Sequence, residues 1–528
     1  MWKNVTLAVL LSTSLFSTSV SAAATENDHA ENRYKHVQLL GINDLHGQLD
    51  VYRDIGGRQA GGAEYLAAYL KQYEEETKNT LLVHAGDVVG ASSPVSSLLQ
   101  DEPTIEILNE LGFDVGTLGN HEFDEGVDEM MRLIDGGEHE ITGDFEGSSF
   151  PYTAANVVDE NTGEPILPPY VIKKVNGIPI GFIGVVTTET QNIVLPSGIE
   201  GVAFTDETEA INDAAKQLKE QGVESIVVLA HAPASSEQDG SNPSGDVVEF
   251  APQIDDEVDV ILGGHNHDYA NTVVDGKLIV QSYSSGTAFS DIDLMIDPKT
   301  KDIISKEANI VTTYHDAIEP DEQVANMVDT YETEIEDLVD QVIAETSETI
   351  TTAQDDSGES ALGNLVADSQ RTAMDTDFAF MNPGGIRADL DEGPVTWGEL
   401  YTMLPFGNTL VNMTLTGEQI KALLEQQWEG SYPHMLQVSG LQYTWEQDAP
   451  IGEKVVELTD NEGNPIESDQ PYTVTVNNFL AEGGDGFTVL TEGTDQVTGP
   501  LALDAMITYL EGLDGQVTAP ELGRIDVE

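Results

Sequence analysis

The sequence predicts an α/β (α+β) protein with a larger domain over residues 34–315 and a smaller mixed α/β domain over residues 350–528. Short runs rich in Val, Ile and Leu recur through the first domain with helical patterns between several of them, which is typical of buried strands covered by helices. An amphipathic segment at 316–349 separates the two parts. A length of 528 residues is sufficient for two to four domains at about 150 residues each.

Composition excludes several kinds of chemistry. The chain has no cysteine, so disulfides, thiol nucleophiles and thiolate metal sites are excluded. It has 95 Asp and Glu against 21 Lys and Arg, a formal net charge of −74. We therefore expect no nucleic-acid polymer as a partner, because the phosphates would be repelled.

The same acidity indicates a habitat. Carboxylates repel one another at low ionic strength, and molar salt screens them. We expect a halophilic protein, with an alkaline-tolerant secreted protein as the alternative.

The first 23 residues read as a signal peptide. Lys3 precedes an apolar run over 5–20, and Ser21, Ala22 and Ala23 supply a small-residue cleavage site. The run is short and rich in Ser and Thr, so an uncleaved anchor is the weaker interpretation. We expect a protein that is secreted, extracellular or associated with the cell wall, with no transmembrane segment.

Five apolar runs of the first domain end in polar residues beside glycine. The runs and the residues that follow them are 37–43 with Asp44 and His46, 81–85 with Asp87, 113–118 with Asn120, His121 and Asp124, 226–230 with His231, and 258–262 with His265 and His267. Open α/β sheets place ligands at the carboxyl ends of their strands, so we expect these side chains to converge on one edge.

The types of these residues indicate metal chemistry. Imidazole together with carboxylate and amide oxygens suits Zn, Mn, Co or Fe better than an all-oxygen Ca²⁺ or Mg²⁺ cage. A carboxylate can bridge two cations, and Asp87 is the candidate. Two ions about 3.5–4 Å apart lower the pKa of a bridging water and neutralise phosphoryl oxygens, which makes hydroxide available for attack on phosphorus.

The segment between the domains predicts a connecting helix followed by a linker. Its apolar residues recur at spacings of three and four, at Val324, Met327, Val328, Tyr331, Ile335, Leu338, Val339 and Val342. Residues 351–358 are polar, which predicts a linker that could serve as a hinge between the domains.

The second domain places aromatic rings and a cation in glycine-rich loops. The residues that stand out are Asn382, Arg387, Phe406, Asn408, Phe479 and Asp485. Two aromatic rings on such loops could sandwich a planar base by stacking, and the fork of an arginine suits phosphate. The alternative for Phe406 and Phe479 is that they only anchor their loops.

Taken in order, these motifs carry a family resemblance. Asp-x-His, Gly-Asp, Gly-Asn-His-Glu, a lone His after a strand and Gly-His-x-His resemble the calcineurin-like metallophosphoesterases. Asn-Asp-Leu-His-Gly and Gly-Asn-His-Glu-Phe-Asp resemble the 5′-nucleotidase/UDP-sugar hydrolase branch, and residues 350–528 resemble its C-terminal domain. The resemblance implies a four-layer αββα domain joined by a helix to a substrate-binding domain.

The resemblance also implies roles. It implies two divalent metal ions, one held by Asp44, His46, Asp87 and His267, the other by Asp87, Asn120, His231 and His265. His121 would stabilise the transition state and leaving group, oriented by Asp124. In the second domain it implies that Phe406 and Phe479 clamp the base, Asp485 holds ribose hydroxyls, Asn382 and Arg387 bind polar groups of the substrate, and Asn408 touches the base.

The function implied is a monomeric, exported nucleotide phosphohydrolase of the 5′-nucleotidase type, in which a metal-held hydroxide attacks phosphorus. One departure matters: Ala361 stands where many members carry a phosphate-binding Arg. A 2′,3′-cyclic-nucleotide 2′-phosphodiesterase/3′-nucleotidase or a UDP-sugar hydrolase therefore stays open, as do an inactive nucleotide-binding surface protein and a sulfur-compound hydrolase.

Overall fold

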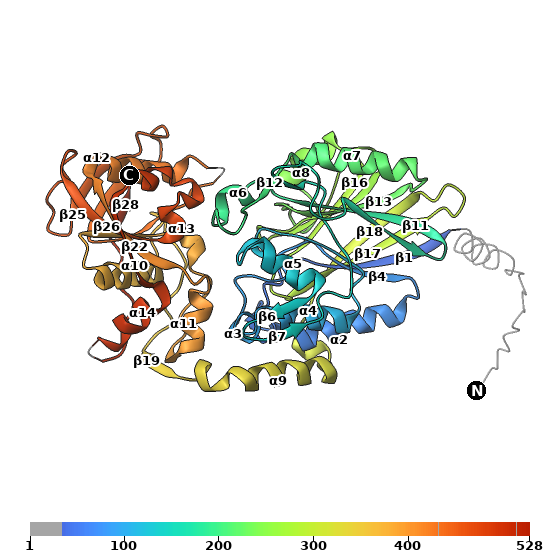
Figure 1. The fold of residues 1–528 in the computed structure, drawn as a ribbon, viewed down its shortest axis with the longest axis horizontal. Helices are drawn as coiled ribbons and strands as arrows, with labels where there is room; N and C mark the ends of the chain where they lie inside the picture. The colour runs from blue at the N-terminus through green and yellow to red at the C-terminus, as the bar shows by residue number, and fades with distance from the viewer. Residues whose placement is uncertain (1–33, 431, 514) are drawn as a thin grey trace, which may run out of the picture.

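A computed structural model describes residues 34–430, 432–513 and 515–528. The predicted signal peptide at 1–23 lies outside the described residues. Figure 1 shows two lobes, with the N-terminal lobe in blue to yellow and the C-terminal lobe in orange to red. The helix α9 (Glu322–Val339) runs between them. Among the described helices, none has the length and apolar character needed to cross a membrane.

Within the described part of the N-terminal lobe, two six-stranded sheets form the centre. The first contains, in spatial order, β18 (Ile303–Thr312), β17 (Ala288–Ile296), β1 (Lys35–Ile42), β4 (Thr80–His84), β5 (Val115–Thr117) and β8 (Tyr152–Thr153). The second contains β10 (Tyr170–Val175), β11 (Ile178–Val186), β13 (Ser225–His231), β14 (Val258–Leu262), β16 (Lys277–Ser282) and β15 (Tyr269–Val274). Strands β1, β4 and β5 are parallel, as are β13 and β14, so their carboxyl ends share an edge.

Alternation along the strands builds the layers. Leu39 packs with Leu229 in the apolar core shared by the two sheets, whereas Leu40 faces the helices α2 (Ala63–Glu76) and α4 (Glu102–Leu111). Val228 faces the other way, toward α7 (Glu207–Glu220) and α8 (Asp246–Phe250). The described elements therefore stack as helix, sheet, sheet, helix, which confirms the predicted fold class.

Short elements complete this lobe around the edge of the sheets. They are β2 (Tyr52–Asp54), β3 (Gln59–Gly61), α3 (Pro94–Ser97), α5 (Val127–Asp135), β6 (Gly137–His139), β7 (Gly143–Phe145), β9 (Val157–Asp159), α6 (Thr190–Ile193) and β12 (Val202–Phe204). Of these, α3, α5 and α6 are the closest to the C-terminal lobe in Figure 1.

The connecting helix belongs to the N-terminal lobe. The Asp321 side chain caps its first turn by accepting hydrogen bonds from the backbone of Gln323 and Val324, and buried Val324 and Val328 pack into the apolar core beside α2. The helix ends at Val339, so the prediction that Val342 extends its apolar face is wrong. Val342 is 58% exposed and begins a strand.

That strand, β19 (Val342–Thr346), pairs with β21 (Gly393–Thr396) of the C-terminal lobe. Its β-branched residues are compatible with a strand as well as with the helical spacing of apolar residues. The hydrogen-bonded pairing with β21 determines that this segment is a strand. The polar segment at 351–358 is held near both ends, where the Thr352 backbone donates a hydrogen bond to Asp389 at 2.7 Å and the backbone oxygen of Ser357 accepts one from the Trp445 indole at 3.0 Å, while residues 353–356 between them are exposed.

The described C-terminal lobe has a five-stranded and a three-stranded sheet. Their strands in spatial order are β23 (Gln437–Ser439), β20 (Phe378–Met381), β26 (Pro471–Asn477), β22 (Thr409–Thr416) and β27 (Thr494–Leu501), then β25 (Val455–Asp460), β24 (Leu441–Trp445) and β28 (Ile525–Val527). The helices are α10 (Ala361–Met374), α11 (Trp397–Met403), α12 (Gly417–Glu425), α13 (Asn478–Ala481) and α14 (Ala502–Glu511). The loops after β20, α11 and β26 face the N-terminal lobe.

Candidate metal centre and substrate cavity

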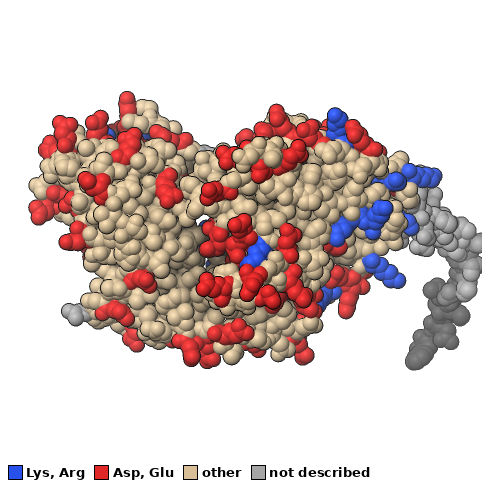
Figure 2. Space-filling model, viewed as in Figure 1, with Lys and Arg blue, Asp and Glu red and all other residues tan. Residues whose placement is uncertain are grey.

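A cavity of about 1150 Å³ lies between the two lobes. Figure 2 shows the hollow between them, with acidic side chains along its rim. The N-terminal lobe contributes predicted metal-site residues to its lining, and the C-terminal lobe contributes all six predicted substrate residues.

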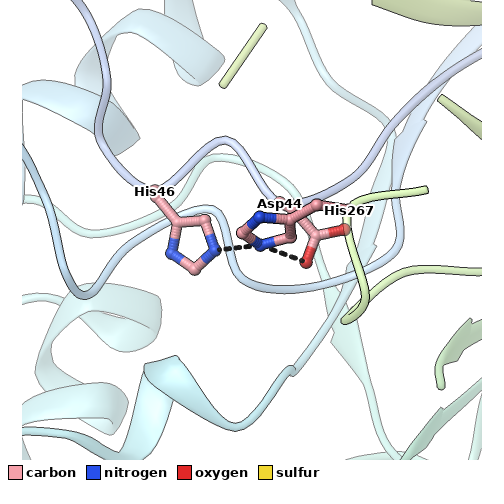
Figure 3. A group of neighbouring side chains, drawn as sticks. All are labelled: Asp44, His46 and His267. Carbon is pink, nitrogen blue, oxygen red and sulfur yellow. Dashed lines mark hydrogen bonds and ion pairs between the residues drawn. The ribbon is translucent and has the colours of Figure 1, made fainter. Parts of the chain in front are cut away.

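One group of predicted metal ligands follows β1 and β14. The Nε2 atoms of His46 and His267 are 3.0 Å apart, and Nε2 of His267 is 3.6 Å from Oδ1 of Asp44 (Figure 3). Their geometry allows the three side chains to hold one ion.

A second group lies beside the first. Oδ2 of Asp87 is 3.0 Å from Nε2 of His231 and 3.8 Å from Nε2 of His46. Oδ1 of Asn120 is 3.2 Å from Nε2 of His231 and 2.9 Å from Nδ1 of His265. Asp87 therefore stands between the two groups, and the structure brings all seven predicted ligands together.

The tautomers of two histidines fit a metal. Nδ1 of His46 lies 2.9 Å from the Gly90 carbonyl oxygen, and Nδ1 of His231 lies 2.9 Å from the Ala85 carbonyl oxygen. Each Nδ1 donates its proton there, so Nε2 is the ring nitrogen that faces the other predicted ligands. Burial lowers the pKa of His231, but the carboxylates of Asp87 and Asp44 outweigh it and raise the pKa to about 9, so a bound cation would displace the proton on Nε2.

Burial shapes the charges of this edge. It raises the pKa of Asp44 to about 7, and it lowers the pKa of both His265 and His267 to about 3. The two imidazoles are therefore neutral near pH 7, which is the form that binds metals. A cation placed among them would restore the charge of the Asp44 carboxylate.

Five of the seven residues have backbone angles that side chains rarely adopt. Their φ values are 51° for Asp44, 52° for His46, 49° for Asp87, 81° for His265 and 58° for His267. Such conformations cost of order 1–3 kcal/mol each and persist where the surroundings enforce them, which is common at functional sites.

The predicted catalytic pair is in contact. Nδ1 of His121 is 2.8 Å from Oδ2 of Asp124, and the His121 backbone donates a hydrogen bond to Oδ1 of Asp87 at 2.8 Å. Burial lowers the pKa of His121, but the carboxylates of Asp124 and Asp87 outweigh it and raise the pKa above its ordinary value. The ring faces Phe406 of the other lobe, with centroids 5.8 Å apart and planes at 18°.

Arg387 brings a positive charge from the C-terminal lobe to this edge. Its guanidinium carbon lies 5.9 Å from the centroid of the Phe406 ring. Burial lowers its pKa, while Asp87, Asp124 and Asp44 act in the opposite direction. Among the described lining residues it is the only Lys or Arg.

The remaining predicted substrate residues line the same cavity. Nδ2 of Asn382 donates a hydrogen bond to Oδ2 of Asp485 at 2.9 Å. The Phe479 ring lies over Gly484, where an added Cβ would be 2.5 Å from ring atoms. Asn408 lies on the lining between Phe406 and β22.

Sequence reasoning missed two residues that support the ligands. The Glu122 carboxylate accepts hydrogen bonds from the backbone of Val88 at 2.9 Å, of Asp87 at 3.0 Å and, at very short range, of Gly119. Asn43 donates from Nδ2 to Oδ2 of Asp44 at 2.6 Å. Each residue is adjacent in the sequence to a predicted site residue, Asn43 to Asp44 and Glu122 to His121. That adjacency is the sequence feature that could have indicated a supporting role.

Known families match both lobes. Residues 37–269 match the calcineurin-like phosphoesterases, and residues 342–492 match the 5′-nucleotidase C-terminal domain. A crystal structure of a 5′-nucleotidase precursor from Thermus thermophilus superposes with a TM-score of 0.80 at 30% identity, covering 93% of this chain and 99% of that one. The chain belongs to the 5′-nucleotidase family.

This family of metal-dependent phosphoester hydrolases includes larger relatives. Endonuclease YhcR of Bacillus subtilis is 41% identical over 99% of this chain, which spans 44% of that protein. Cell wall protein Lmo0130 of Listeria monocytogenes is 38% identical over 92% of this chain and 69% of its own length. The chain therefore spans less than half of one relative and about two thirds of the other.

Proposed function

We propose that this 5′-nucleotidase-family protein releases phosphate from nucleotides in a metal-dependent hydrolysis, as an exported monomer with its domains at 34–315 and 350–528. The observation that carries the proposal is the cluster of seven predicted metal ligands, four of which (Asp87, Asn120, His265 and His267) line one cavity together with His121 and Arg387. The pattern of residues 1–23 supports export, as does the name of the Listeria relative.

The donor set suits two divalent ions. One would be held by Asp44, His46, Asp87 and His267, and the other by Asp87, Asn120, His231 and His265. When bound, such ions (Zn, Mn, Co or Fe) polarise a water molecule and neutralise phosphoryl oxygens.

The chain's own residues position the substrate. Arg387 binds phosphoryl oxygens through its fork of N–H donors. Asp124 holds Nδ1 of His121, so Nε2 is available to donate a hydrogen bond to the phosphoryl group or a proton to the leaving oxygen. Phe406, Phe479 and Asn408 bind the base, and Asp485, held by Asn382, accepts hydrogen bonds from the ribose.

A second candidate is hydrolysis of 2′,3′-cyclic nucleotides and 3′-nucleotides. Arg387 is the single Lys or Arg in the described lining, and Ala361 supplies no second cation. Of these substrates, the cyclic phosphodiester carries one negative charge and needs less positive charge in the cavity than a monoester dianion at the 5′ or 3′ position. More than half of the relative named an endonuclease lies outside the match, so its name gives little guidance on substrate.

A substrate panel tests both candidates. Purified protein is chelated, reloaded with each metal and assayed against 5′-, 3′- and 2′,3′-cyclic nucleotides, a UDP-sugar and 4-nitrophenyl phosphate. We expect chelation to abolish phosphate release and one of the four metals to restore it. Activity that survives complete chelation would refute the proposal.

A variant pair tests the role of His121. We expect His121→Ala to lower kcat by about a hundredfold or more, as the loss of a positioned acid commonly does, while metal content stays unchanged. The matched control is His36→Ala, because His36 lies at the opposite end of β1. Equal turnover in the two variants would remove His121 from the mechanism.

A further inference from the structure

A stacked pair of rings stands at the C-terminal side of the cavity. The rings of Tyr432 and His434 have centroids 4.5 Å apart and planes at 21°, and both residues line the cavity. Tyr432 is 58% exposed, which is high for a large aromatic side chain. The roles proposed above use neither residue.

The His434 ring lies beside Asp485, the residue proposed above to bind the ribose. Nδ1 of His434 is 4.0 Å from Oδ2 of Asp485, and the two side chains are 21% and 10% exposed. Asn477 donates a hydrogen bond to Asn382 at 3.0 Å, and Asn382 donates to the same Oδ2 of Asp485 at 2.9 Å. Oδ1 of Asp485 accepts no hydrogen bond from any described residue, so it is available to a ligand.

The backbone supports a binding role for this carboxylate. Asp485 has φ 55° and ψ 19°, a left-handed conformation, in the short 3₁₀ turn Gly484–Gly486. That turn packs against α6 of the N-terminal lobe, so the segment that carries Asp485 contacts both lobes. Strain enforced on a polar residue in a cavity is typical of ligand sites.

The charges around the pair restrict what can bind there. Burial, together with the nearby charges of Glu189 and Asp485, raises the pKa of the Tyr432 hydroxyl, and Asp246 and Glu249 also line the cavity. A second phosphate group would be repelled at this end. A neutral group with hydroxyl donors and a planar ring fits, because carboxylates accept from hydroxyls and aromatic rings stack on bases.

We propose that Tyr432 and His434 are specificity-determining residues that select nucleoside 5′-monophosphates with a free ribose, rather than 2′-deoxyribose. Tyr432 holds the His434 ring by stacking, and His434 holds the Asp485 carboxylate toward the 2′ and 3′ hydroxyls. This inference rests on the proposed nucleotide hydrolysis and names the substrate class of that site.

Steady-state kinetics test the proposal with three substrates: a ribonucleoside 5′-monophosphate, its 2′-deoxy analogue and 4-nitrophenyl phosphate. We expect His434→Ala and Tyr432→Ala each to raise KM for the ribonucleotide about tenfold and to reduce the preference over the deoxy analogue. Both variants should leave the aryl phosphate unchanged, and Tyr432→Phe should behave as wild type. Because Tyr432 is exposed, its variants give a test even where His434→Ala does not fold.

The chain offers a matched control. Tyr65 and His315 form another stacked pair, 3.6 Å apart at 6°, outside the cavity lining. His315→Ala should leave all three substrates unaffected. Equal losses on nucleotide and aryl phosphate, or an unchanged ribose preference, would overturn the inference. Activity confined to 2′,3′-cyclic nucleotides would overturn it too, while a wild type that cleaves only aryl phosphate would refute the proposed function itself.

Discussion

Glu122 shows how one side chain can hold two loops of the site in place. Its carboxylate is buried and accepts backbone hydrogen bonds from the loop after β4 and from Gly119 after β5. Burial and the nearby Asp87 raise its pKa to about 7. The residue binds no proposed metal, yet the position of Asp87 depends on it.

We expect Glu122→Ala to lower the free energy of unfolding by about 2 kcal/mol or more, because buried N–H groups lose their acceptor. Metal affinity should fall as well, since the Asp87 loop is released. Chemical denaturation and metal titration measure the two effects. The control is Glu110→Ala, an exposed glutamate of α4. A variant as stable as this control would show that the loops do not need the carboxylate.

Residue chemistry is the part of the site that sequence could predict. Asp, Asn and His beside glycine after apolar runs pointed to the edge where the structure gathers them. The supporting residues could not be predicted in this way, because Glu122 and Asn43 act through backbone and side-chain contacts that exist only once distant loops meet. The left-handed backbone of Asp87 or His265 is likewise a result of tertiary packing.

At the scale of elements, the loop after β26 determines where an aromatic ring of the cavity lies. Oδ1 of Asn477 caps α13 by accepting a hydrogen bond from the Leu480 backbone N–H, and Phe479 lies on this single turn. The ring rests on Gly484 with no room for a side chain beneath it. The turn and Gly484 therefore fix the position of the Phe479 ring in the cavity lining.

We expect Gly484→Ala to raise KM for nucleotides about tenfold and to leave KM for 4-nitrophenyl phosphate unchanged, because the new Cβ displaces the Phe479 ring from the base site. A suitable control is Gly512→Ala, where φ is −82° and an added Cβ meets nothing closer than 3.4 Å. An unchanged nucleotide KM would remove Phe479 from base binding.

Sequence predicted the strands of the first domain well, since their apolar runs are long and end abruptly. It did less well at the junction between the lobes. Val342 satisfied the helical period, but β19 exists because β21, some fifty residues later, is there to pair with it. Local periodicity carries no information about that partner.

For the whole molecule, charge is the dominant feature. Figure 2 shows carboxylates over both lobes and cations gathered mainly at the far end of the N-terminal lobe. The formal net charge of −74 opposes compaction at low salt. The approach of Arg387 to the metal edge could not be predicted from sequence, because it depends on how the two lobes are placed.

We expect the unfolding temperature to rise by about 5 °C or more between 0.05 M and 2 M NaCl, since the Debye length falls to a few ångströms and repulsion is screened. Calorimetry at each salt concentration measures it. Sucrose at equal osmolality is the control, because it favours compact states without screening charge. An equal rise in sucrose, or no rise in salt, would contradict a halophilic protein.

The left-handed backbone of the proposed ligands has a consequence for evolution. At a φ near 50°, glycine folds more comfortably than aspartate or histidine. A laboratory selection that scored heat resistance alone would therefore let glycine accumulate at positions such as Asp44 and His46. The selected variants would be more stable proteins that no longer bind the proposed metals or hydrolyse substrate.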